Sequence, residues 1–221
     1  MCCALLPLAV LAQERTAIST ELPASAVTQL EKSLAASKAH ARHVWRDTPP
    51  LNEDGTVNAY VEISRGDRRK WEFDMAANAR AIDRVIPAKI GGYPVNYGFV
   101  PQTVSYDGDP FDALVLGPAI SGGRLVRGTV MGLLLMDDEK GDDAKVVLTP
   151  DTPGGARPAL TEEVRQQIAG YFRRYKLFEP EKFSHVAGWG TVADGRDLVS
   201  VTHRFFEQCR QTSATACLVA R

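Results

Sequence analysis

Apolar and polar residues alternate in the region that starts near residue 51. Every second residue of the first run is apolar, namely Val57, Ala59, Val61 and Ile63. This period of two is typical of a β-strand whose two faces differ. The polar run 65–68 predicts a turn, and residues 70–74 alternate again, so the two runs predict a hairpin.

Further short apolar runs occur at 111–116, 125–136 and 146–148, separated by clusters of Gly, Pro and Asp. Runs of this length between turn residues indicate short strands. A series of such strands predicts a small barrel or a strongly bent sheet.

Two later segments carry apolar residues at helical spacing. Thr161 can cap the first helix, and Glu162 and Glu163 favour the positive end of its dipole. Its apolar stripe is Val164, Ile168, Tyr171, Phe172 and Tyr175. The second stripe is Leu198, Thr202, Phe205, Phe206 and Cys209. Strands first and helices last predict an α+β domain with helices outside the barrel.

The region before the strands, residues 13–50, predicts a helical N-terminal extension to a main domain at 51–210, which a tail at 211–221 follows. Val27, Leu30 and Leu34 recur at helical spacing. Trp45 and the breaker at 48–50 are expected to close this helix. We interpret its basic residues as a solvated face rather than a binding patch: Lys32, Lys38, Arg42 and Arg46.

The amino-acid composition limits the kinds of binding partner that this protein is expected to have. The 221 residues are 44% hydrophobic and 24% charged, which is ordinary for a globular protein. A net charge of −1 creates no overall field, so binding to nucleic acid or to a membrane is not implied. No apolar run reaches the roughly 18–20 residues of a membrane-spanning helix. We therefore expect a soluble protein.

The first residues, 1–12, contain no charged side chain and are almost wholly apolar from Cys2 to Leu11. Small residues near Ala12 favour a signal peptide cleaved there, so we expect a periplasmic or secreted protein. No Lys or Arg precedes the apolar run, and a cytoplasmic protein is the alternative. Cleavage would leave Cys209 and Cys217, either as a disulfide or as two unrelated thiols.

Three carboxylates crowd the segment Asp107–Asp112, DGDPFD. They repel one another unless positive charge lies between them, and their hard oxygens suit Mg²⁺ or Mn²⁺. Gly108 and Pro110 favour a tight, stiff turn that presents the carboxylates in one direction. A solvated acidic turn is the alternative. A calcium EF-hand does not fit, because Asp112 and Pro118 stand where that loop needs Gly and Glu.

A second acidic loop, 137–145, follows the apolar run that ends at Met136. Alone it would be an ordinary charged hairpin tip. The polar face of the predicted hairpin offers Glu62, Lys70 and Glu72 together, because alternation places them opposite apolar residues. That face could be plain surface or could line a cleft.

These segments together resemble the family I soluble inorganic pyrophosphatases. Asp107–Ala113, DGDPFDA, is similar to the signature of that family, and other segments match it in order and approximate spacing. They are Val61-Glu62-Ile63, Lys70-Trp71-Glu72, Asp83-Arg84, Tyr93–Gly98, Asp138–Lys145 and Tyr175-Lys176. The resemblance covers residues 51–190.

The resemblance implies a five-stranded OB-like β-barrel with flanking helices and Mg²⁺-dependent hydrolysis of diphosphate to two phosphates. An acidic cleft would hold roughly three or four Mg²⁺ ions, with Mn²⁺ as a possible substitute. The implied metal-site residues are Asp107, Asp112, Asp138, Asp143, Glu62 and Glu72, of which Asp112 bridges two ions. The implied phosphate-binding residues are Lys70, Arg84, Tyr97, Tyr175 and Lys176. Asp109 would accept a proton from the nucleophilic water.

Hydrolysis of diphosphate independently requires metal-binding carboxylates together with basic side chains. Diphosphate is highly anionic, so metal ions and charge-assisted hydrogen bonds must neutralise it before a nucleophile can approach. A non-catalytic barrel that binds polyanions or nucleic acid is an alternative, but its groove should be rich in Lys and Arg rather than carboxylates. A metal phosphatase acting on other phosphate substrates is a further alternative.

The sequence departs from the family pattern at three places. Ser64 stands where proline commonly follows the Glu-Ile pair, and the turn between Glu62 and Lys70 is short. The 13–50 extension is unlike compact bacterial members. A homo-oligomer is still expected, but this extension weighs against the usual bacterial hexamer.

Overall fold

The computed structural model describes residues 19, 21–151, 155 and 157–211. The expected signal segment and Cys217 lie outside these residues, so export and the disulfide stay predictions. The helices are α1 (Ala24–Ser37), α2 (Val44–Asp47), α3 (Glu162–Phe172) and α4 (Val192–Gln211). The strands are β1 (Val57–Ile63), β2 (Arg69–Asp74), β3 (Ala79–Val85), β4 (Asn96–Phe99), β5 (Asp112–Val115), β6 (Arg124–Asp138), β7 (Gly141–Asp142), β8 (Lys145–Pro150) and β9 (Ser184–Gly190).

Five strands close into a ring in the order β1, β4, β5, β8 and β6. The long strand β6 completes it, because β6 pairs with β8 on one side and with β1 on the other. β7 and β9 pair with further parts of β6, and β2 and β3 form a separate two-stranded sheet. The predicted five-stranded OB-like barrel in an α+β chain is confirmed.

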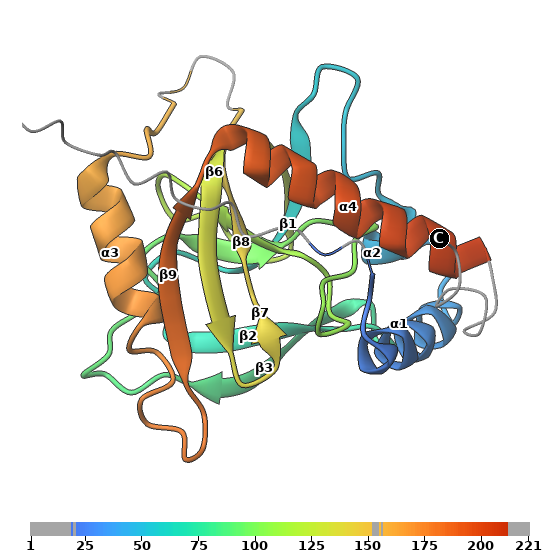
Figure 1. Ribbon diagram of the computed structural model, residues 1–221, viewed down its shortest axis with the longest axis horizontal. Coiled ribbons are helices and arrows are strands. Elements are labelled where there is room, and N and C mark those ends of the chain that lie inside the picture. The colour runs from blue at the N-terminus through green and yellow to red at the C-terminus, as the bar shows by residue number, and fades with distance from the viewer. Residues whose placement is uncertain (1–18, 20, 152–154, 156, 212–221) are drawn as a thin grey trace, which may run out of the picture.

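The helices cover the outside of this barrel. Figure 1 shows α4 running across β6 and β8, and α3 beside β9. All six residues of β8 are buried, because the strand faces the barrel interior on one side and is covered on the other. α4 contributes Leu198 and Val199 to the apolar cluster with Val146 and Leu148 of β8. Packing of the amphipathic helix on the barrel thus follows from its apolar stripe.

The predicted hairpin between 57–63 and 70–74 is wrong. β1 pairs instead with β4 and β6, and β2 pairs with β3. The turn at 65–68 is real, but Tyr93 holds it: the Tyr93 carbonyl accepts from the Gly66 N–H at 2.8 Å, and the Tyr93 N–H donates to Asp67 at 3.0 Å. The chain after β1 therefore turns away from its predicted partner.

The late helices follow the predicted stripes, with one difference. The Thr161 hydroxyl accepts from the Val164 N–H at 3.3 Å, so the predicted cap of α3 is confirmed. The helix ends at Phe172, and Tyr175 lies beyond it. Tyr175 still stacks on Tyr171, with ring centroids 6.0 Å apart. The apolar stripe therefore continues through a non-helical turn.

The described part of the N-terminal extension contains two helices rather than one. α1 ends at Ser37, well before Trp45, which belongs to the short α2. The Arg46 guanidinium donates to the Ser37 carbonyl at 2.7 Å, so a side chain from α2 adds a second hydrogen bond to a carbonyl at the end of α1, which also accepts from the His40 N–H. Arg46 is therefore not part of a solvated face, contrary to the prediction.

Among the helices of the described residues, none combines the length and the apolar character needed to cross a membrane.

Candidate active site

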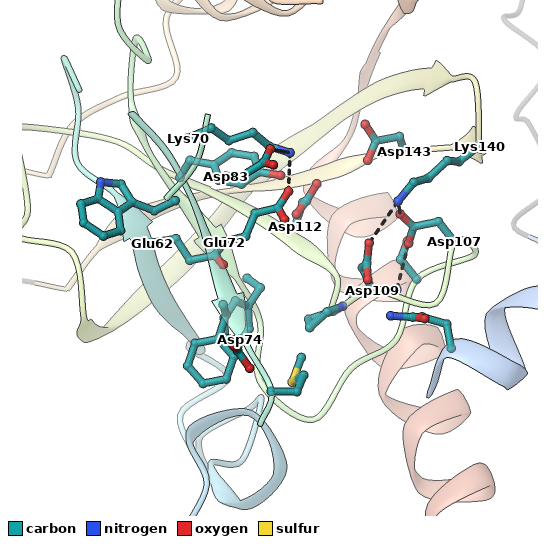
Figure 2. A pocket seen from close by; sticks show the side chains of 18 of the residues that line it. Glu62, Lys70, Glu72, Asp74, Asp83, Asp107, Asp109, Asp112, Lys140 and Asp143 are labelled. Atoms are coloured by element: carbon teal, nitrogen blue, oxygen red, sulfur yellow. Dashed lines mark hydrogen bonds and ion pairs between the residues drawn. The ribbon is translucent and has the colours of Figure 1, made fainter. Parts of the chain in front are cut away.

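All twelve side chains predicted for the site line one cleft of about 620 Å³. They are Glu62, Lys70, Glu72, Arg84, Tyr97, Asp107, Asp109, Asp112, Asp138, Asp143, Tyr175 and Lys176. Figure 2 shows Asp107, Asp109 and Lys140 on one side of this cleft and Glu62, Lys70 and Glu72 on the other. Residues from distant parts of the sequence therefore converge on one place.

The acidic loop 107–112 is held in a defined shape. Gly108 has φ +90°, a conformation that favours glycine, and a Cβ there would lie 2.9 Å from the Ala26 carbonyl oxygen. The Ser105 N–H donates to the Asp109 carbonyl at 2.7 Å, and buried Phe111 anchors the end of the loop. Figure 2 shows Lys140 bonded to both Asp107 and Asp109, at 3.4 and 3.3 Å.

The parallel pairing of β5 and β8 builds the floor of the cleft. Ala113 lies opposite Val146, so the preceding residues, Asp112 and Lys145, start neighbouring strands at the same edge. The Lys145 side chain is only 1% exposed, and its ammonium group bonds Asp112 and, at 2.8 Å, Asp143. A buried cation is thus shared by two carboxylates.

A second shared cation comes from the segment after α3. The Lys176 ammonium lies 2.6 Å from Asp138 and 2.8 Å from Glu139, and its side chain is almost fully buried. Asp138 ends β6, and Glu139 follows it in the second acidic loop. The loop is therefore tied to the segment that also carries Tyr175.

The β2–β3 hairpin forms the opposite wall. Its register places Lys70 across from Arg84. Arg84 pairs with Glu179 at 2.7 Å and also with Asp83. Asn78, at the hairpin turn, accepts from the Val44 N–H at 3.0 Å and donates to the Arg42 carbonyl at 3.2 Å. The hairpin is therefore tethered to the N-terminal extension.

Three carboxyl groups of the cleft resist ionisation. Burial and then the nearby Asp112 carboxylate raise the pKa of Glu62 well above its usual value. Burial and Asp107 raise the pKa of Asp109 to about 6, against the opposing effect of Lys140. Burial raises the pKa of Asp143 to about 7, although Lys145 acts in the opposite direction. Crowded carboxyls with raised pKa values are typical of sites that bind cations or transfer protons.

The tyrosines of the cleft stay protonated. Burial raises the pKa of Tyr97 and of Tyr175 well above the usual value, and the nearby carboxylates act in the same direction. Their hydroxyls are therefore hydrogen-bond donors at neutral pH. Such donors suit the oxygen atoms of an anion.

The donor set of the cleft fits magnesium. Ten acidic and six basic side chains line it, so the carboxylates are in excess. In the described residues, no group of three or more His, Cys, Asp or Glu is gathered closely enough to hold a metal ion, and lysines bond several of the carboxylates. Uncompensated carboxylate oxygens are the ligands that Mg²⁺ and Mn²⁺ prefer.

Several residues of the cleft were missed by sequence reasoning. Lys145, which lies beneath the cleft, is the clearest case, and its signal was a lysine at the very start of a mostly apolar strand. Glu139, Lys140 and Lys182 line the cleft itself. Charged residues in surface-like loops give no local sign that they turn inward.

The comparisons with known proteins agree with this geometry. A sequence model described as inorganic pyrophosphatase matches residues 59–207. The inorganic pyrophosphatase of Saccharolobus solfataricus is 35% identical over 151 residues, which cover 65% of this chain and 87% of that protein. The enzyme of that name from Halobacterium salinarum is 32% identical over 174 residues, covering 75% and 97%.

A solved structure gives the same result. The crystal structure of inorganic pyrophosphatase from Thermus thermophilus has a TM-score of 0.68 and 33% identity, covering 74% of this chain and 99% of that chain. Its coverage shows that almost the whole of that protein has a counterpart here. The family match spans more than half of the present sequence and includes both acidic loops. This chain belongs to the inorganic pyrophosphatase family.

Proposed function

We propose that this chain hydrolyses inorganic diphosphate to two phosphates and that it requires Mg²⁺. The observation that carries the proposal is the convergence of twelve side chains, carboxylates in excess with interspersed cations, on one cleft of a pyrophosphatase-family domain. A cleft of this composition cannot accept a polyanion unless cations first offset its carboxylates.

The metal ligands we propose are Asp107, Asp112, Asp138 and Asp143, with Glu62 and Glu72 lining the site. Roughly three or four ions would be held, and Mn²⁺ could replace Mg²⁺. When bound, these ions neutralise phosphate charge and lower the pKa of coordinated water.

The cations and tyrosines bind the phosphate groups in this proposal. Lys70 and Arg84 do so from the hairpin wall, Tyr97 from β4, and Tyr175 and Lys176 from the segment after α3. Lys70, Arg84 and Lys176 are each paired with a carboxylate. When diphosphate binds, a phosphate group would take the place of that carboxylate, so the cation would not be left unpaired.

Asp109 is the proposed general base. It is half exposed, and Lys140 is the cation that contacts it. Asp112, by contrast, bonds the buried Lys145 at the floor. A half-exposed carboxylate on a stiff loop can reach a water molecule in the cleft, whereas Asp112 is already engaged by a buried cation.

Phosphate release from diphosphate by the purified protein tests this function. We expect turnover with Mg²⁺, none after chelation, and recovery when Mg²⁺ is restored. ATP and a phosphomonoester, each with Mg²⁺ and with Mn²⁺, should be poor substrates. Faster hydrolysis of either one would favour a general metal phosphatase. Absence of release from diphosphate under all metal conditions would refute the proposal.

Self-association is a separate proposal. Ile82 and Val85 of β3 are 49% and 53% exposed, and Phe183 is 51% exposed. Exposed apolar side chains on a sheet edge are typical of contact surfaces. Sedimentation equilibrium gives the mass directly, and a monomer at all concentrations would exclude a homo-oligomer.

A further inference from the structure

The active-site cleft has a wall that lies outside the family domain. α1 precedes the matched segment 59–207, yet four of its residues line the cleft. They are Gln29, Lys32, Ser33 and Ala36, spaced three and four apart along one face of the helix. The extension therefore contributes surface to the site itself.

Close packing holds α1 at this position. A Cβ at Gly108 would lie 2.6 Å from the Gln29 Cβ, so the helix touches the backbone of the acidic loop. Leu30 is fully buried in a cluster with Trp45 and Phe206. The Tyr106 hydroxyl donates to the Ser19 carbonyl at 2.8 Å, which ties the same loop to the chain before α1. The wall is a fixed part of the molecule.

Lys32 differs from the other cations of the cleft. Five of the six basic side chains that line the cleft lie within 4.0 Å of a carboxylate: Lys70, Arg84, Lys140, Lys176 and Lys182. Within the described residues, Lys32 forms no such pair. Its side chain is exposed, so the ammonium group can reach across solvent at the rim.

We propose that Lys32 is a substrate-binding residue at the rim, which attracts diphosphate into the cleft. The proposal rests on the proposed function, because diphosphate is the anion concerned. An uncompensated cation at the entrance raises the local concentration of an anionic ligand and affects association more than chemistry. Lys32 should therefore influence KM and not kcat.

Steady-state kinetics of Lys32→Gln against Lys38→Gln test the proposal. Lys38 caps the same helix, is exposed and does not line the cleft, so it controls for the loss of one positive charge. At low ionic strength we expect the KM of Lys32→Gln to rise about two- to five-fold, as for one exposed charge, with kcat unchanged. The rise should vanish near ~1 M salt, where the Debye length is about 3 Å. Lys38→Gln should match the wild type.

The results that would refute the role of Lys32 differ from those that would refute the proposed function. An unchanged KM in Lys32→Gln, an equal rise in Lys38→Gln, or a parallel fall in kcat would each overturn the role of Lys32. A wild-type protein that releases no phosphate would instead refute the proposed function. Calorimetric titration of diphosphate and Mg²⁺ into wild type and Lys32→Gln then still tests Lys32, because weaker binding in the variant is required with or without turnover.

Discussion

The ammonium group of Lys145 lies 2.8 Å from the Asp143 carboxylate and bonds Asp112 as well, beneath the cleft. Burial acts against the charge of this lysine, but the two carboxylates raise its pKa above the usual value. The lysine therefore stays charged at the start of a fully buried strand. Without it, two acidic side chains would repel each other at the floor of the barrel.

Lys145→Met should destabilise the protein in metal-free buffer. Removing one partner of a buried ion pair typically costs about 3–5 kcal/mol. We expect about 3 kcal/mol, because the Asp112 and Asp143 side chains remain about a fifth exposed. Denaturant unfolding measures this loss, and added Mg²⁺ should restore part of it by binding the native state.

Lys140→Met is the matched control for that variant. Lys140 also bonds two carboxylates, but its side chain is 56% exposed. The free energy of unfolding should change by less than about 0.5 kcal/mol. Equal losses in the two variants, or a Lys145→Met protein as stable as the wild type, would contradict the proposed role of the buried cation.

Asp112→Asn should weaken Mg²⁺ binding and nearly abolish turnover while the fold remains. Asp112 occupies the floor between the two acidic loops, where a ligand could serve two ions. Calorimetry measures Mg²⁺ affinity, and circular dichroism checks the fold. Asp74→Asn is the control, since Asp74 lines the same cleft without an assigned role. Normal Mg²⁺ dependence with near-normal turnover in Asp112→Asn would remove this residue from the metal site.

Local patterns predicted several strands and the two late helices, but they predicted neither the strands β3, β4 and β9 nor which strands pair. Alternation at 57–63 and the cap at Thr161 are local signals, and both elements form where predicted. The partner of β1 is decided by contacts with β4 and β6, which lie far along the chain. No pattern within β1 contains that information, so the nearest run in sequence was chosen wrongly.

The same distinction between local patterns and long-range contacts applies to the residues of the active site. Motif residues such as Asp107 and Asp112 carry a recognisable local signature, and they lie in the cleft as expected. Lys145 acts through the parallel register of β5 and β8, which only the folded barrel creates. Lys32 is exposed, in agreement with the predicted solvated face, but a helical pattern does not show that this face borders the cleft.

Asp109→Asn should lower kcat strongly and leave binding largely intact. Loss of a general base typically costs ~10²–10⁴-fold in rate, and we expect the lower half of that range because bound Mg²⁺ already acidifies water. The KM for diphosphate should stay within a few-fold, and the Mg²⁺ affinity should be preserved. Loss of Mg²⁺ binding as severe as in Asp112→Asn would make Asp109 a ligand, and full turnover would assign the proton to another group.

Acid should destabilise the native protein through His43, whose ring is buried where the extension meets the β2–β3 hairpin. His43 is only 2% exposed, and its Nε2–H donates to the Met75 carbonyl at 3.0 Å. Its Nδ1 accepts from the Arg46 N–H at 3.3 Å and caps α2. The cap requires the neutral ring, because a proton on Nδ1 removes the acceptor, whereas Nε2–H can donate to Met75 in either state.

The environment of His43 gives the sign of this pH dependence. Burial is the main cause that lowers the pKa of His43 below its usual value near 6.5; Arg46 and His40 also lower it, while the Met75 carbonyl and Asp47 oppose them. The native state therefore prefers the neutral ring. The stability that His43 contributes is complete above about pH 6.5 and is lost as the pH falls through the lower native pKa.

His43→Asn separates this effect from general acid denaturation. Asparagine can cap α2 through its side-chain oxygen but does not titrate. The variant should be less stable than the wild type near neutral pH, by about 1–3 kcal/mol, because the ring and its bond to Met75 are lost. Between about pH 7.5 and about pH 5 that difference should shrink, since only the wild type must bury a group that tends to protonate. Urea unfolding of both proteins at each pH measures it, and effects of the other carboxylates cancel in the comparison. A difference that stays constant, or that grows toward acid pH, would show that His43 does not link the extension to the hairpin in a pH-dependent way.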